Sequence, residues 1–441
     1  MTEVEGSGGT PGTPAPAVSG PQVLAALAGL PGGAELLDAA RARSDLALVG
    51  GAVRDLLLGR APRELDVVLD AGAGAFADEL AAAIGTATGD APVVTVHERF
   101  GTAALEWPGG RIDIAERRAE TYDSPGALPR VRAAEAREDL ARRDFTVNAI
   151  ALPLAGDHRG ELQHPEHALA DLRAGLLRAL HDRSFIEDPT RLLRLARYRA
   201  RLGFDVEPHT AALAEQALRD TALARVSRAR VGAELRLALG EGDAVASLES
   251  MAALGALAAI DPSLRIDRTV MTRALALLPD DPPQARADLL ALAALLDLGA
   301  PDGARSGQAL FALLDGLEFT AADRDRVVGS VLGAGPLAHA LASTMRPSEL
   351  HAAVAGEPLE AVALAGAIAG EGSPGEASAR LWLDSLRHVR LAIGGEELLA
   401  AGVPAGPELG RRLAIALARR LDGELADGAE AELDAALEAR P

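Results

Sequence analysis

The stretch of sequence that decides the fold is LVGGAVRD, residues 48–55. An apolar run, residues 46–49, ends at two consecutive glycines, and an amphipathic run, residues 52–58, follows. This order predicts a strand, a tight turn and a helix. Gly50 and Gly51 allow a ligand to approach the backbone closely, so that N–H groups face a phosphate, and Arg54 adds a guanidinium to the same anion. An ordinary strand-to-helix corner with an exposed Arg54 explains the same pattern.

A second segment, RELDVVLD over residues 63–70, reads as a strand at Leu65–Leu69. Glu64 and Asp66 are two residues apart, so their side chains lie on one face of that strand. Two such carboxylates repel each other unless a divalent cation neutralises them, and Mg²⁺ prefers oxygen ligands of this kind. Asp113, in the alternating segment Arg111–Ala115, is a candidate third carboxylate from a neighbouring strand. The alternative is a polar strand end that only caps the sheet.

The remaining pattern divides the chain into an α/β part and a helical part. Further strands are expected at residues 93–96, 102–105 and 111–115, and a helix at about residues 75–83. Strand signals nearly vanish after Asp139, and from about residue 165 Leu and Ala recur at helical spacing. We expect a mixed-sheet α/β head followed by an all-α neck, body and tail. The predicted divisions are a disordered tail at 1–21, the head at 22–155, the neck at 156–245, and the body and tail at 246–441.

Composition excludes several classes of protein. The chain of 441 residues has no Cys, which rules out a disulfide scaffold, a thiol nucleophile and Cys-ligated zinc or iron–sulfur sites. No apolar run approaches the roughly 20 residues of a membrane helix, and the N-terminal segment with Glu3 and Glu5 is no signal peptide. We therefore expect a cytoplasmic protein without a membrane partner.

Charge and amide content are unusual. The net charge of −20 argues against a polyanionic partner, but arginines outnumber acids within residues 130–236. The chain has no Lys, so every Lys or Arg position is Arg, and Asn148 is the single Asn. A lone surviving Asn suggests that its amide does something specific.

Two more segments are dense in polar groups. ARRDFTVNA, residues 141–149, contains Arg142, Arg143 and Asp144 beside the lone Asn; a solvated loop is the plain alternative. In EDPTRLLRLAR, residues 187–197, Asp188 as N-cap and a following Pro predict a helix start. Arg191, Arg194 and Arg197 then share one helix face, where a carboxylate with a guanidinium can read a nucleobase edge. A well-capped helix with a solvated arginine stripe is the alternative.

The four segments, in this order and spacing, resemble the class II tRNA nucleotidyltransferase/poly(A) polymerase family of the DNA polymerase β superfamily. The segments at 120–122, 126–131, 171–178, 394–398 and 402–410 are also similar to segments of these enzymes. One departure concerns the metal strand, which in the family usually reads Asp-x-Asp, whereas here Glu64 takes the first position. The extra methylene displaces the carboxylate, and a misplacement of about 1 Å can cost on the order of 100-fold in rate.

The resemblance implies roles for particular residues. Gly50, Gly51 and Arg54 hold the triphosphate of the incoming nucleotide, and Glu64 and Asp66 bind Mg²⁺ with the assistance of Asp113. Arg143 and Asp144, with Arg142 nearby, contact phosphate and ribose. By the same resemblance, Asp188 and Arg191 pair with the base edge of CTP or ATP. Arg194 and Arg197 support them.

The resemblance further implies Mg²⁺-dependent addition of CMP and/or AMP, from CTP and ATP, to the 3′ end of tRNA. A poly(A) polymerase acting on other RNA 3′ ends is a second hypothesis within the same class. A third is an RNA-binding paralogue with weakened catalysis, which Glu64 and the overall acidity motivate. Substitution of Glu64 and Asp66 by Ala separates an enzyme from a binder. An enzyme loses its activity, whereas a binder keeps its affinity for RNA.

Overall fold

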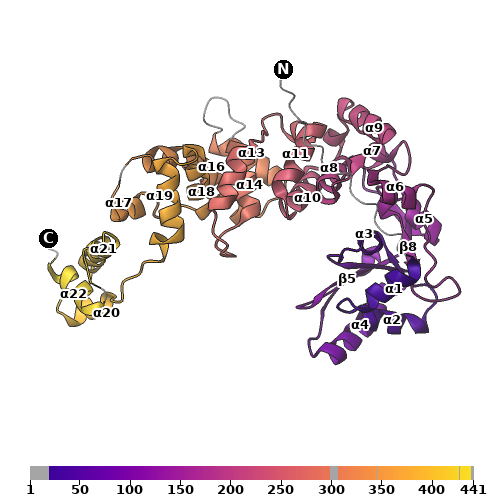
Figure 1. The fold of residues 1–441 in the computed structure, drawn as a ribbon, viewed down its shortest axis with the longest axis horizontal. Coiled ribbons are helices and arrows are strands. Elements are labelled where there is room, and N and C mark those ends of the chain that lie inside the picture. Colours follow the sequence, from indigo (N-terminus) through magenta and orange to yellow (C-terminus); the bar gives the residue numbers. More distant parts are fainter. Residues whose placement is uncertain (1–18, 298–305, 344, 427, 439–441) are drawn as a thin grey trace, which may run out of the picture. The chain divides into compact units, whose positions relative to one another are not determined.

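A computed structural model of the chain describes residues 19–297, 306–343, 345–426 and 428–438. The chain forms two compact units, Met1–Val226 and Ser227–Pro441, whose elements are labelled in Figure 1. The boundary between the units falls inside residues 156–245, the predicted neck, and the finer division into neck, body and tail stays a prediction. Of the expected tail at 1–21, residues 1–18 lie outside the described residues. Gly20 and Pro21 already belong to the first helix, because Ser19 and Gln22 form a capping box there.

Unit 1 is built on a six-stranded sheet in the order β3-β4-β5-β2-β1-β8. β2 and β5 run parallel, while the other neighbours are antiparallel, so the sheet is mixed as the sequence predicted. Its strands are β1 (Ala47–Val49), β2 (Leu65–Leu69), β3 (Val93–His97), β4 (Thr102–Trp107), β5 (Gly110–Glu116) and β8 (Ala151–Pro153). Sequence patterning missed β8, whose three residues are all buried and show no alternation.

Two smaller sheets and a set of helices complete unit 1. β6 (Arg118–Thr121) pairs antiparallel with β7 (Arg130–Ala133), and β9 (Leu176–Leu177) pairs parallel with β10 (Asp205–Val206). The α-helices are α1 (Gly20–Ala28), α2 (Gly33–Ala39), α3 (Gly51–Leu57), α4 (Ala73–Thr88), α5 (Ala136–Ala141), α6 (Ala168–Ala174), α7 (Ser184–Glu187), α8 (Thr190–Leu202) and α9 (Pro208–Arg219). The 3-10 helices are η1 (Ala40–Ala42), η2 (Glu98–Phe100), η3 (Thr146–Asn148) and η4 (Ala222–Arg225).

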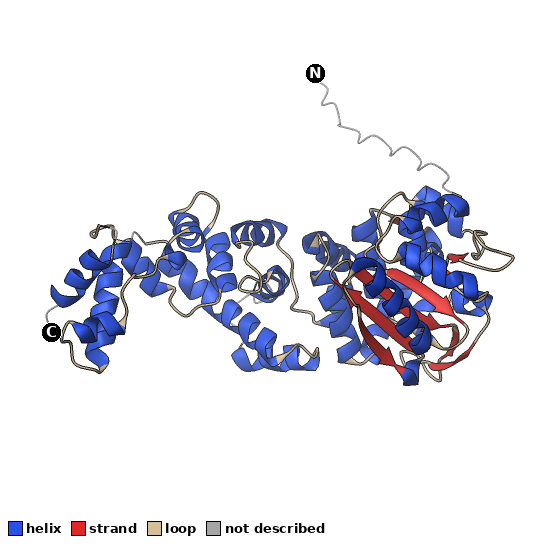
Figure 2. Cartoon of the chain, turned by 90° about the horizontal axis from the view of Figure 1, so that it is seen from below, coloured by secondary structure: helices blue, strands red, loops and turns tan. Residues whose placement is uncertain are grey.

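Helices cover the main sheet and fix its position. α4 packs against β3, β4 and β5, and α3 packs against β1 and β2. Figure 2 shows the strands in red with blue helices beside them. Part of the core lies between β1, β2, β8 and α5, where Val49, Val68 and Leu140 are buried together. The strand ends that carry the polar motifs are thereby held on a packed scaffold.

Unit 2 is helical throughout its described residues. Its elements are α10 (Arg228–Leu239), α11 (Ala244–Leu254), α12 (Ala256–Ile260), α13 (Arg268–Leu277), α14 (Ala287–Asp297), α15 (Gly307–Gly316), α16 (Ala321–Leu341), α17 (Pro347–Ala353), α18 (Leu359–Ala369), α19 (Pro374–Asp384), η5 (Leu386–His388), α20 (Gly395–Ala400), α21 (Pro407–Leu421) and α22 (Ala429–Glu438). α13, α14, α16 and α19 all pack on α18, which is apolar on most sides and carries one acid, Glu360. The fold class predicted from the sequence, an α/β head followed by helices, is confirmed.

Buried charge within unit 2 is paired. The carboxylate of Glu360 on α18 is fully buried, and it accepts from Arg326 Nε at 2.7 Å and from Arg326 Nη2 at 2.8 Å. The backbone N–H of Arg286 donates to the same carboxylate at 2.7 Å.

In the part of the chain that the structure describes, no single helix is long and apolar enough to cross a membrane, and only the bent pair at 20–28 and 33–42 reaches that length and composition together.

Candidate active site

The glycine turn lies directly beside the predicted metal strand. Gly50 follows β1 with φ +66°, a backbone conformation that disfavours any side chain, and α3 begins at Gly51. A Cβ added at Gly50 would lie 2.8 Å from Arg143 Nη1 and 3.9 Å from Asp66 Oδ2. The turn therefore needs glycine for its conformation and also for the space that Arg143 occupies.

The three predicted metal-binding carboxylates come together. Asp66 on β2 is the register partner of Asp113 on the parallel strand β5, and Glu64 immediately precedes β2. One oxygen from each carboxylate lies within 4.8 Å of the other two. Burial and the neighbouring charge of Glu64 raise the pKa of Asp66 to about 7, although Arg143 acts against this shift. Neighbouring carboxylates disfavour one another's ionisation, and a hard divalent cation bound between them would relieve that repulsion.

Arg111 is a basic residue at this cluster that the sequence analysis passed over. It precedes Asp113 by two residues on β5, so both side chains lie on one face. Its Nε donates to both Asp113 oxygens, at 3.1 and 3.0 Å, and lies 3.8 Å from Glu64 Oε2. It also contacts Glu106 on β4. The signal was present in the alternating sequence of β5, where Arg111 and Asp113 are two residues apart.

The two adjacent arginines share one buried acid. Asp139 Oδ1 accepts from Arg142 Nε at 3.0 Å and from Nη2 at 2.8 Å, and Arg143 Nη2 donates to Oδ2 at 3.0 Å. Burial raises the pKa of Asp139, but the guanidinium groups of Arg143 and Arg142 outweigh that effect and leave the pKa below its usual value. Arg143 Nε is buried and has no hydrogen-bond partner in the described chain, so this guanidinium retains a donor.

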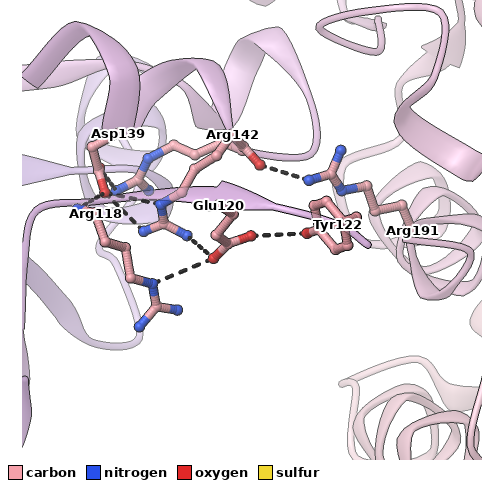
Figure 3. A network of polar contacts seen from close by, with 7 residues as sticks. Arg118, Glu120, Tyr122, Asp139, Arg142 and Arg191 are labelled. Carbon is pink, nitrogen blue, oxygen red and sulfur yellow. Dashed lines mark hydrogen bonds and ion pairs between the residues drawn. The ribbon is translucent and has the colours of Figure 1, made fainter. Parts of the chain in front are cut away.

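Arg142 is also the centre of the polar network drawn in Figure 3. Its Nη1 donates to Glu120 Oε1 at 2.9 Å, and the Tyr122 hydroxyl donates to Glu120 Oε2 at 2.9 Å. Burial and the charge of Glu120 raise the pKa of Tyr122, so the phenol keeps its proton and donates. Arg191 Nη2 donates to the backbone carbonyl of Arg142 at 2.6 Å. This bond joins the predicted phosphate segment to the predicted base-recognition helix.

Arg54, Asp144 and Asn148 form a buried group. Arg54 is 1% exposed and contacts Asp55 Oδ1 at 2.8 Å and Asn148 Oδ1. Arg54 is therefore a buried residue beneath the glycine turn, not the exposed arginine of the alternative reading. Asp144 is also buried; burial alone would raise its pKa, but Arg194, Asn148 and Arg191 lower it to about 2.

The helix α8, which carries the arginines predicted to recognise the base, begins one residue later than predicted. α8 starts at Thr190 with Pro189 as its N-cap, and Asp188 Oδ1 accepts from Thr190 N at 3.1 Å and from Thr190 Oγ1 at 2.6 Å. Asp188 still stabilises the helix start.

The arginines of α8 are partly buried and are not a solvated stripe. Arg191 is 4% exposed and donates to Ser184 Oγ at 2.8 Å in addition to its bond to Arg142. Arg194 donates to Asp144, and Arg197 packs on the ring of Tyr198 with 4.9 Å between the guanidinium carbon and the ring centroid. The sequence analysis missed Tyr198, which also lies against Arg54 and Arg194. Its aromatic side chain among the arginines of residues 189–202 was the available signal.

Comparisons with known proteins agree with this geometry. Residues 46–178 match the family described as the poly A polymerase head domain. The chain is 44% identical over 218 residues to the A-adding tRNA nucleotidyltransferase of Halalkalibacterium halodurans, covering 48% of this chain and 49% of that protein. It is 43% identical over 199 residues to the CC-adding tRNA nucleotidyltransferase of Deinococcus radiodurans, covering 45% and 50%. The matched stretches thus span about half the length of these curated relatives.

The structural comparison extends over more of the chain. A solved structure of a CCA-adding enzyme in an apo form superimposes with a TM-score of 0.72 at 26% identity, covering 91% of this chain and 95% of that one. The likeness therefore includes both the α/β head and most of the helical remainder. The head-domain match, the curated relatives and this likeness together relate the chain to the tRNA nucleotidyltransferases and CCA-adding enzymes.

Proposed function

We propose that this protein is a Mg²⁺-dependent tRNA nucleotidyltransferase that adds CMP and/or AMP, from CTP and ATP, to the 3′ end of tRNA and releases pyrophosphate. The observation that carries the proposal is the cluster of Glu64, Asp66 and Asp113 beside the Gly50–Gly51 turn. The named activities of the A-adding and CC-adding relatives support it. A protein that acts on tRNA is expected in the cytoplasm, and we propose that compartment.

The donor set fits Mg²⁺. Glu64, Asp66 and Asp113 offer only carboxylate oxygens, which hard divalent cations prefer. These three residues would hold Mg²⁺, which would supply positive charge to lower the pKa of the RNA 3′-hydroxyl for in-line attack on the α-phosphorus and to stabilise the pyrophosphate leaving group. Glu64, which takes the place of the family's usual Asp and lies just before β2, has a carboxylate oxygen within 4.8 Å of those of Asp66 and Asp113.

The triphosphate is placed at the glycine turn. Gly50 and Gly51 keep the backbone bare, and Arg143 holds its guanidinium over the turn with a spare Nε donor. Arg142 is held by Asp139 and Glu120, so Arg143, which contacts Asp139 through Nη2 and keeps its Nε donor, is the better placed of the two for an anionic ligand. Arg54 is enclosed by Asp55 and Asn148. Its positive charge therefore acts on the triphosphate from within the protein.

Base recognition is assigned to Asp188 and Arg191 at the start of α8, with Arg194 and Arg197 behind them. Arg191 is held by Ser184 and by the carbonyl of Arg142, which fixes the direction of its guanidinium. A fixed carboxylate and guanidinium can accept from an amino group and donate to ring acceptors of CTP or ATP. The protein, not a nucleic-acid template, would then select the nucleotide.

Nucleotide incorporation tests the proposal. Purified protein with Mg²⁺ is offered tRNA transcripts that end before CCA, after C or after CC, with CTP and ATP separately and together. Ordered addition that stops at CCA, or addition of C only or of A only, supports the proposal and names the product. Long A tails on varied RNAs would instead indicate a poly(A) polymerase. Binding of tRNA without incorporation would indicate the paralogue with lost catalysis and overturn the proposal.

A further inference from the structure

Asn148 links two parts of the site through its side-chain amide. It ends η3 and is 5% exposed. Its Oδ1 accepts from Arg54 Nη1, and its Nδ2 donates to Asp144 Oδ1 at 2.9 Å. The amide therefore presents its acceptor to a cation and its donor to an anion.

The link continues into α8. Asp144 Oδ2 accepts from Arg194 Nε at 2.8 Å and from Arg194 Nη2 at 2.6 Å, and Arg194 Nη2 lies 3.1 Å from the Tyr198 hydroxyl. Asp144 Oδ1 also accepts from the backbone N–H of Phe145 at 2.8 Å. Asn148 thus connects Arg54 on α3 to the Asp144–Arg194 pair by hydrogen bonds, beside the ring of Tyr198, which packs on both arginines.

No other side chain reproduces this bridge at that position. An isosteric Asp keeps the acceptor for Arg54 but places a second carboxylate against Asp144. Ala or Ser is too short to reach both partners, and Gln adds a methylene inside a closely packed site. The need for one donor and one acceptor explains why an otherwise Asn-free chain has an Asn here.

We propose that Asn148 is a positioning residue that aligns Arg54, beneath the glycine turn, with the Asp144–Arg194 pair of the base-recognition helix. Asn148 thereby fixes the position of Arg54, at the triphosphate end of the nucleotide site, relative to Asp144 and Arg194 at the base end. The consequence for nucleotide binding rests on the proposed function, whereas the bridge itself does not. Loss of the bridge is expected to weaken binding of CTP and ATP without removing any group assigned to contact them.

The charged groups around the bridge determine how it responds to pH. Those that face it are Arg54 and Asp55 from α3, Arg201, Arg191 and Arg194 from α8, and Asp144 from the segment before η3. In Asn148→Asp, the introduced carboxyl and Asp144 share one buried site, so the pair retains a proton to higher pH than either acid alone. When that proton is bound, an O–H donor to Asp144 is restored.

Asn148→Asp is tested on the full chain by its Tm between pH 5 and pH 8. We expect its Tm to lie several degrees below that of the unaltered protein at pH 8 and to approach it as the pH falls. The matched control is Gln216→Glu on α9. Gln216 bridges Arg219 and Asp220 in the same way, at 2.9 Å to each, but on an exposed surface where solvent screens the charges. Its Tm difference is expected to be small and independent of pH.

Nucleotide affinity distinguishes positioning from bulk stability. Dissociation constants for CTP and ATP are measured by calorimetry at pH 8 and pH 5.5, below the Tm of each variant. We expect at least a tenfold loss for Asn148→Asp and Asn148→Ala at pH 8, with recovery at pH 5.5 for Asn148→Asp only. An unchanged affinity, or equal recovery in both variants, would overturn the positioning role.

Failure of the proposed function gives a different pattern. In that case the unaltered protein binds neither CTP nor ATP, while the pH-dependent Tm difference of Asn148→Asp remains. A Tm for Asn148→Asp that follows the unaltered protein at every pH would overturn the bridge itself.

Discussion

Asp66 and Asp113 are register partners on the parallel strands β2 and β5, and their carboxylates meet Glu64 at the same end of the sheet. Parallel pairing is what brings them together, because side chains in register on neighbouring strands lie on the same face. The likeness of this cluster to a metal site can be tested one carboxylate at a time.

Removal of a cluster carboxylate should abolish catalysis and spare RNA binding. We expect Asp66→Ala and Glu64→Ala each to lower nucleotide incorporation by about 100-fold or more, because displaced catalytic geometry costs that much. Binding of tRNA, measured by filter retention, should stay within about twofold. Glu106→Gln is the control, since Glu106 shares Arg111 with the cluster but lies outside it. Incorporation that survives Asp66→Ala would remove the metal assignment.

Arg111 should compete with a cation for the cluster. Its guanidinium contacts Asp113 and lies near Glu64, so Arg111→Gln is expected to tighten Mn²⁺ binding by about two- to fivefold, as for an exposed ion pair. Electron paramagnetic resonance of free Mn²⁺ measures this without catalysis. Arg99→Gln on η2, an exposed arginine that packs on Phe100, is the control and should change nothing. Weaker Mn²⁺ binding in Arg111→Gln would mean that Arg111 supports the site.

Gly50 should tolerate no side chain. Gly50→Ala places a Cβ against Arg143, whereas Gly59, at a similar φ of +70°, has nothing within 4 Å of an added Cβ. We expect Gly59→Ala to lower the free energy of unfolding by about 1–2 kcal/mol through backbone strain alone. Gly50→Ala should lose about 1–3 kcal/mol more through overpacking. Urea denaturation of both variants measures the difference, and equal losses would show that Arg143 moves aside freely.

Asp144 should make the stability of unit 1 depend on acid. Its pKa is lowered to about 2 in the folded chain, so its contribution is present above pH 4, where the unfolded chain is also ionised. That contribution is lost as the pH falls toward 2 and amounts to about 2 kcal/mol. Asp144→Asn should therefore lose less stability than the unaltered protein between pH 4 and pH 2. Asp78→Asn, an exposed acid on α4, should follow the unaltered curve. Parallel curves for all three would contradict the pairing with Arg194.

The sequence by itself determined the class of fold, and it named three carboxylates that the structure brings together. Alternation and apolar runs identified β2 and most of the other sheet strands, and the two glycines identified the turn into α3, because these signals are local. The pairing of Glu64 with Asp66 followed from strand geometry alone. The short strand β8 was missed, whereas β1, which is equally short and buried, was marked by the two glycines that follow it.

Only the tertiary structure decided what each polar group contacts. Asp113 joins the carboxylate cluster because β5 pairs in register with β2, a long-range contact that no local pattern encodes. Arg54 is buried and Arg191 is tied to the Arg142 carbonyl for the same reason. The sequence marked Asn148 only as the single Asn, whereas the packing of α3, η3 and α8 placed a cation on one side of its amide and a carboxylate on the other. Composition can show that a residue is rare, but its partners depend on which distant elements pack together.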